Sequence, residues 1–240
     1  MKGTVHPLSV ENRGGFVYCP PEAAAGKGSL PVVYGLGESW ESFESYLPKL
    51  ETAFKKGAQP FLFVGVGCDW NREMTPWAAA AAFRGQPDFG GEADSFLCQL
   101  QQSVKPAVDS TFPTLPDRAH TAVMGYSLGG LAALYSLYQC EEIALCACLS
   151  GSLWYEGWMD YMETHRVSAD AKVYLSLGRA EEKSRHPLMG KIGDCTRQAQ
   201  EILSRQTDRE VPLLWHNGGH HIEVEARKLQ ALLWLSENWK

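Results

Sequence analysis

Apolar and polar positions along the chain form alternating blocks that predict strands and helices in turn. Short apolar runs, typical of buried strands, occupy residues 30–34, 60–66, 120–126, 143–149, 172–177 and 211–215. Between these runs, apolar residues recur every three or four positions, which predicts helices near 43–56, from 94, after 127, at 158–165, at 189–205 and after 221. The face predicted to be buried in the last helix consists of Ile222, Ala226, Leu229 and Leu233.

Strands that alternate with helices predict a mostly parallel sheet with helices on both faces, an α/β three-layer sandwich. Residues 1–30 contain short extended pieces and the pair Gly14-Gly15, which favours an antiparallel entry into this sheet. No internal repeat, low-complexity tract or linker is present, so residues 1–240 are expected to form one domain.

Composition narrows the possible partners. The chain has 240 residues, of which 45% are hydrophobic, and a formal charge of −6, which argues against nucleic acid or an anionic membrane as a main partner. No apolar run is long enough to span a bilayer, and residues 1–7 lack the apolar core of a signal peptide, so a cytoplasmic location is expected. The seven cysteines include no C-x-x-C pair and are interpreted as mostly buried thiols without a metal.

The strongest candidate for chemistry is Gly125-x-Ser127-x-Gly129, because it follows a predicted strand and opens a predicted helix. In this pattern the serine occupies a strained strand-to-helix turn, where a Cβ two residues away on either side would collide with the neighbouring chain. The interpretation favoured is a nucleophilic serine, and the alternative is an ordinary glycine-rich turn.

Further candidates lie where other predicted strands end. Glu181 follows the strand at 172–177, and His220 follows the strand at 211–215, so serine, acid and histidine come in the order described for α/β-hydrolases. His220 is the predicted general base, with His221 as the alternative. Glu181 is the predicted carboxylate, expected within hydrogen-bond reach of the His220 nitrogen that does not face the serine; the alternatives are Glu182 or no acid at all, a serine–histidine dyad.

Two other groups complete the predicted site. The oxyanion is expected to bind the backbone N–H of Leu128 and that of Leu36 or Gly37. The long connection at 67–91 is rich in aromatic residues and forms either a wall of the site or a cap on the core. Arginines such as Arg72 could pair with an anionic ligand or hold loops together through nearby carboxylates.

These motifs resemble the α/β-hydrolase superfamily and, within it, the putative-esterase group that contains enterochelin (siderophore) esterases, S-formylglutathione hydrolases and feruloyl esterases. The resemblance covers essentially the whole chain and depends on residues 125–130, 175–178 and 218–220. Residues 69–72 and 75–77 are similar to the arginine-bearing loop of the siderophore-esterase branch, which implies that Trp70 and Arg72 contact the substrate. The chain departs from the group at Tyr34-Gly35, where histidine-glycine is usual.

The predicted function is hydrolysis of a small-molecule carboxylic ester through an acyl-enzyme, with no metal or organic cofactor. Acyl transfer to an alcohol and a non-catalytic binding protein on the same scaffold are the alternatives. The sequence makes no prediction about the oligomeric state.

Overall fold

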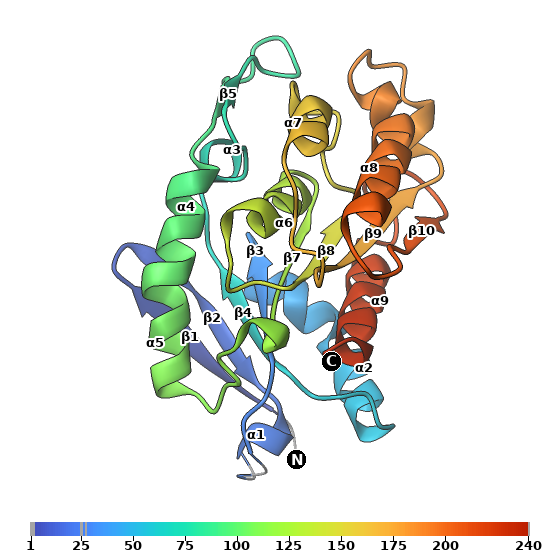
Figure 1. Cartoon of the computed structure of the whole chain (residues 1–240). Coiled ribbons are helices and arrows are strands. Elements are labelled where there is room, and N and C mark those ends of the chain that lie inside the picture. Colours follow the sequence, from blue (N-terminus) through green and yellow to red (C-terminus); the bar gives the residue numbers. More distant parts are fainter. Residues whose placement is uncertain (1–2, 25, 27, 240) are drawn as a thin grey trace.

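A computed structural model describes residues 3–24, 26 and 28–239 of the chain (Figure 1). Its main feature is an eight-stranded sheet with the order β1-β2-β4-β3-β7-β8-β9-β10. These strands are β1 (Thr4–Val10), β2 (Arg13–Cys19), β3 (Val32–Leu36), β4 (Leu62–Val66), β7 (Thr121–Tyr126), β8 (Leu145–Leu149), β9 (Lys172–Gly178) and β10 (Leu213–His216). A separate two-stranded ribbon pairs β5 (Ala78–Ala79) with β6 (Phe89–Gly90).

Strand directions follow the expected mixed pattern. Strands β4, β3, β7, β8, β9 and β10 are parallel neighbours, whereas β2 pairs antiparallel with both β1 and β4. The predicted antiparallel entry into the sheet is therefore confirmed. Because the six parallel strands point the same way, their carboxyl ends meet at one edge of the sheet, where the loops that carry the candidate residues begin.

Helices cover both faces of the sheet (Figure 1), which confirms the three-layer α/β prediction. One face is covered by α2 (Trp40–Lys55) and α9 (Val224–Glu237). The opposite face is covered by α4 (Ala93–Gln99), α5 (Lys105–Thr111), α6 (Leu128–Gln139), α7 (Trp158–Thr164) and α8 (Ile192–Gln206). Two one-turn helices, α1 (Pro21–Ala24) and α3 (Trp70–Glu73), lie within connections.

Helix α6 is the central helix of its layer. Every residue from Leu128 to Leu137 is buried, as the apolar composition of this stretch predicts. A helix buried on all sides cannot tilt or slide without disturbing the sheet, so its first turn, directly after Ser127, has a firmly defined position.

The buried face of α9 differs from the prediction. Ile222 precedes the helix and is 52% exposed, Ala226 is exposed, and Leu229 and Leu233 are only half-buried. The buried side carries Arg227, Lys228, Ala231, Leu232 and Leu235 instead. The prediction was wrong because it followed the spacing of apolar residues alone, whereas Arg227 and Lys228 are buried against carboxylates from other elements.

The aromatic connection at 67–91 does both things that its sequence allowed. Trp77 packs against Tyr155, Trp158 and Tyr161, and Phe89 is buried in the same core. Trp70 and Phe83 are 40% and 49% exposed and face a cavity described below.

The sequence predicts that the cysteines are mostly buried thiols. All seven cysteines are free: four are buried, Cys68 and Cys195 are half-buried, and Cys98 is exposed.

Within the described residues, no helix combines the length and apolar character needed to cross a bilayer.

Gly125 provides a test of the steric argument for the strand-to-helix turn. A Cβ at this position would overlap the carbonyl group of Gly129, which belongs to the buried backbone of α6. We therefore expect Gly125→Ala to lower the free energy of unfolding by more than about 2 kcal/mol in urea denaturation. The control is Gly14→Ala, whose Cβ would meet nothing within 4 Å and which should change stability by less than about 0.5 kcal/mol. Equal stability of the two variants would contradict the argument.

Candidate active site

Ser127 lies at the turn between β7 and α6 in a conformation that non-glycine residues rarely adopt. Its φ and ψ are 57° and −121°, which carries a steric cost that the surroundings must offset. The Ser127 N–H donates to the carbonyl of Leu149 at 3.0 Å, and its carbonyl accepts from Ser152 N–H at 3.0 Å and Leu131 N–H at 3.1 Å. Hydrogen bonds from β8, from the loop after it and from α6 thus hold this strained residue in place.

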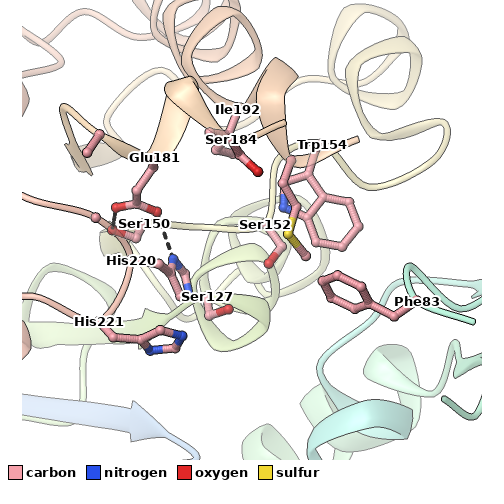
Figure 2. Close-up of a pocket in the computed structure, with 13 residues that line it drawn as sticks. Phe83, Ser127, Ser150, Ser152, Trp154, Glu181, Ser184, Ile192, His220 and His221 are labelled. Atoms are coloured by element: carbon pink, nitrogen blue, oxygen red, sulfur yellow. Dashed lines mark hydrogen bonds and ion pairs between the residues drawn. The ribbon is translucent and has the colours of Figure 1, made fainter. Parts of the chain in front are cut away.

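Glu181 and His220 are in direct contact, as the sequence predicted. Glu181 lies three residues after β9, and its Oε2 is 2.7 Å from Nδ1 of His220, which lies four residues after β10. The ring of His220 lies between Glu181 and Ser127 (Figure 2), so its Nε2 is the nitrogen left for the serine. The alternative acid, Glu182, pairs with Arg197 at 2.6 Å instead.

The Glu181 carboxylate is nearly buried, with a side chain that is 5% exposed, and is nevertheless kept ionised. Burial raises the pKa of this carboxyl, but hydrogen bonds from His220, Ser150 and the N–H of Gly178 outweigh it, and the net pKa lies below its usual range. An ionised carboxylate on Nδ1 fixes a proton there and leaves Nε2 as an acceptor, the tautomer that a general base needs.

Arg227, from α9, is the residue that organises this region and that sequence reasoning missed. Its side chain is 0% exposed, and its Nη1 donates to Oε1 of Glu181 at 2.8 Å and to Ser150 Oγ at 2.9 Å. Its Nη2 donates to the carbonyl of Gly219 at 2.8 Å, directly before His220. The only sequence signal was indirect: Arg227 lies four and eight residues before Ala231 and Leu235, on the same face of the helix.

Tyr126 connects this network to the serine turn. Its hydroxyl accepts from Arg227 Nη1 at 3.1 Å and donates to the carbonyl of His220 at 2.5 Å. The carbonyls on both sides of the His220 Cα are therefore held, one by Arg227 and one by Tyr126, and the histidine loop has a defined position relative to Ser127.

The candidate residues open into one cavity of about 340 Å³. Ser127, Glu181 and His220 line it together with His221, and Trp154 and Phe83 lie on the opposite side (Figure 2). The ring of His221 packs edge to face against that of His220, with ring centroids 4.9 Å apart. Among the described residues, His220 contacts a carboxylate and His221 does not. The three predicted triad positions are thus brought together in one cavity, and the alternative base stands beside it.

The predicted oxyanion donors have different settings. Leu128 is the first residue of α6, so its N–H has no carbonyl within the helix to donate to. Leu36 is the last residue of β3 rather than part of a turn, and the N–H of its alternative, Gly37, donates to the carbonyl of Val66 at 2.8 Å. Leu128 therefore has the better-placed donor for an anion, because the N-terminus of α6 also carries partial positive charge.

Of the two residues predicted to contact the substrate, one lines a cavity at Ser127 and the other does not. Trp70 lines a cavity of about 250 Å³ that Ser127 also lines. Arg72 instead directs its guanidinium to Glu92, with Nη2 2.5 Å from Oε1, and its side chain is 60% exposed. The structure does not bring Arg72 into either cavity, and of the two roles that the sequence left open for it, loop pairing is the one observed.

Among residues 3–24, 26 and 28–239, no group of three or more histidine, cysteine, aspartate or glutamate side chains is arranged to hold a metal ion.

Comparison with known proteins agrees with this geometry. A family model described as "Putative esterase" matches residues 10–227. The chain belongs to this family. Membership of this family, together with a siderophore-esterase relative, supports carboxylic ester hydrolysis, and neither acyl transfer nor a non-catalytic role is favoured for this member.

One relative and one solved structure have names that agree with the predicted group. The chain is 27% identical to the uncharacterized protein YbbA of Bacillus subtilis, over 98% of this chain and 97% of YbbA. It is 29% identical to the siderophore triacetylfusarinine C esterase of Aspergillus fumigatus, over 77% of this chain and 64% of that protein. The crystal structure of an IroE-like serine hydrolase from Shewanella oneidensis superposes with a TM-score of 0.75 at 16% identity, covering 97% of this chain and 79% of the hydrolase.

The burial of Arg227 generates a stability prediction. Arg227→Met should lower the free energy of unfolding by about 3–5 kcal/mol, because it removes the cation that is buried against the Glu181 carboxylate and a donor to the carbonyls of Asn217 and Gly219. Denaturant titration of the purified protein measures this. The control, Arg205→Met, removes a pair with Glu163 at 3.2 Å in which the side chains are 62% and 47% exposed. That change should lower the free energy of unfolding by less than about 1 kcal/mol. A similar loss of stability in both variants would contradict the prediction that the buried contacts of Arg227 stabilise the fold more than an exposed ion pair does.

Proposed function

We propose that this esterase cleaves its substrate through an acyl-enzyme formed on Ser127, with His220 as general base and Glu181 as the carboxylate that orients it. The observation that carries the proposal is the 2.7 Å contact between Glu181 and His220 in the cavity that Ser127 also lines. The strained backbone of Ser127 supports it further, because such strain is typical of functional positions.

In the first step, the Ser127 hydroxyl attacks the ester carbonyl carbon while His220 Nε2 takes the hydroxyl proton. A new C–O bond forms, and the carbonyl electron pair moves onto the oxygen. The resulting imidazolium is stabilised by the Glu181 carboxylate on Nδ1. The oxyanion accepts hydrogen bonds from the backbone N–H of Leu128, with the N–H of Leu36 as the proposed second donor.

In the second step, the tetrahedral intermediate collapses. The bond to the alcohol oxygen breaks, and that oxygen takes the proton from His220 Nε2, so the alcohol leaves neutral and the acyl group stays on Ser127. Water then enters, gives a proton to His220 and attacks the acyl carbon. Collapse of this second intermediate returns the proton to Ser127 and releases the carboxylic acid.

The substrate class that we propose is a small-molecule ester of the siderophore type. The relative from Aspergillus fumigatus is a siderophore esterase by its name, and it shares 29% identity with this chain. The cavity of about 340 Å³ beside Ser127 is of the size that holds a small molecule, and the cavity of about 250 Å³ adjoins it at the same serine.

The roles of Ser127 and His220 can be tested together. Ser127→Ala and His220→Ala should each reduce turnover of 4-nitrophenyl acetate by many orders of magnitude and to a similar extent, because members of one catalytic unit are not additive. His221→Ala, which changes the neighbouring ring of the same cavity, should retain most of the activity. Near-native turnover of Ser127→Ala would overturn the nucleophile, and a more severe effect of His221→Ala than of His220→Ala would move the base to His221.

The role of the acid has its own test. Glu181→Gln should lower the turnover number by about 10²- to 10⁴-fold, because an amide can hold the ring of His220 but favours the wrong tautomer. Glu182→Gln is the matched control, since Glu182 is adjacent in sequence but pairs with Arg197. A fully active Glu181→Gln enzyme would leave a serine–histidine dyad as the mechanism.

A further inference from the structure

The cleft at Ser127 has two ends with different walls. The cavity of about 340 Å³ and the cavity of about 250 Å³ both contact Ser127, Ser152 and Trp154. An ester also has two parts, the acyl group and the alcohol, which extend in opposite directions from the carbon that Ser127 attacks. Each cavity can therefore receive one part, and the positions of the catalytic groups decide which.

The leaving oxygen must lie next to the group that protonates it. On the proposed mechanism this group is His220, which lines the larger cavity and is not among the described lining residues of the smaller one. Leu128, whose N–H receives the carbonyl oxygen, lines the smaller cavity and is not among the described lining residues of the larger. The alcohol is thus directed toward His220 and His221, and the acyl chain continues away from them, toward Trp70.

The smaller cavity has a largely aromatic and uncharged wall. Its wall includes Trp70, Phe89, Pro87 and Phe83, the last of which also lines the larger cavity. The amides of Asn71 and Gln86 line it too, and none of its described lining residues carries a charge. A carboxylate placed there would gain no ionic partner from this wall, whereas an apolar group would gain from contact with the aromatic rings. The volume of about 250 Å³ exceeds the roughly 150 Å³ of a cavity known to hold benzene.

The wall of this cavity is held in place from both sides. Asn71 Nδ2 donates to the carbonyl of Asp88 at 2.8 Å, and His186 Nε2 donates to the carbonyl of Ala82 at 2.9 Å. His186 also packs against Phe83, with ring centroids 4.8 Å apart. A cavity whose loops are tied in this way is formed before a substrate arrives, which lowers the cost of binding.

We propose that the cavity beside Trp70 is the acyl subsite and takes an uncharged, apolar acyl group, and that the cavity beside His221 takes the alcohol. This assignment rests on the proposed acyl-enzyme mechanism. It goes further by stating which cavity receives the acyl group and which receives the alcohol. It also adds a selection against charge on the acyl part.

An alanine-to-leucine substitution in each cavity tests the two subsites independently. Ala82 lines only the smaller cavity and Ala180 only the larger one, among the described residues. Ala82→Leu should reduce the ratio of kcat/KM for 4-nitrophenyl hexanoate over 4-nitrophenyl acetate by about tenfold, since a few methylene groups fill the pocket. Ala180→Leu should instead reduce the ratio for 2-naphthyl acetate over phenyl acetate by about tenfold, because only the alcohol differs.

Selection against charge is tested with the wild-type enzyme. 4-Nitrophenyl hexanoate and the 4-nitrophenyl monoester of adipic acid carry six-carbon acyl groups that differ by a terminal carboxylate. We expect kcat/KM to favour the hexanoate by at least about tenfold. Equal rates for the two esters would overturn the selection against charge.

Other outcomes bear on the assignment of the subsites. An exchanged pattern, in which Ala82→Leu alters alcohol selectivity and Ala180→Leu alters acyl selectivity, would overturn it, and so would unchanged ratios in both variants. Labelling of Ser127 by a fluorophosphonate, followed in all three proteins, reports the mechanism separately. Failure of the subsites with intact labelling is thus distinguishable from failure of the proposed function.

Discussion

A buried positive charge must find partners wherever it lies, and in this protein the partners of one charge are the loops of the candidate site. The guanidinium of Arg227 contacts groups that follow or end four neighbouring parallel strands: Tyr126 in β7, Ser150 after β8, Glu181 after β9 and Gly219 after β10. These four groups accept hydrogen bonds from Nη1 and Nη2 of Arg227, and leaving those donors unpaired in the interior would be costly. Among the described residues, only the Nε of this guanidinium has no hydrogen-bond partner. The requirement to satisfy one arginine therefore sets the distances between loops that are far apart in the sequence.

The neighbouring residue extends the same principle across the sheet. Lys228 Nζ lies 2.6 Å from Oε2 of Glu38, which follows β3, and both side chains are nearly buried. Tyr46 of α2 donates to the other oxygen of this carboxylate at 3.1 Å. Two adjacent cations of α9 thus bind carboxylates that follow different strands, Glu181 after β9 and Glu38 after β3. These ion pairs explain why the charged side of the helix faces inward.

What could be predicted from the sequence was local or topological. The turn at Ser127 follows from glycine spacing, and the meeting of Glu181 with His220 follows from the order of parallel strands, whose carboxyl ends share one edge. Arg227 was not predictable in this way, because an arginine in a helix is exposed unless a distant carboxylate compensates it, and periodicity carries no information about that partner. The same holds for Arg72, whose partner Glu92 lies twenty residues away. Trp70 and Trp77 were equally aromatic in sequence, and only packing shows that one faces a cavity and the other the core.

The position of Arg227 after the three candidate residues in the sequence has a consequence for biosynthesis. Ser127, Glu181 and His220 are all synthesised before α9 is complete, yet the carboxylate and the histidine loop both depend on a side chain of that helix. A nascent chain that already contains the three residues still lacks the contacts that align two of them. We therefore expect hydrolytic competence to arise only when the C-terminal helix docks, so that unfinished chains do not attack esters in the cell.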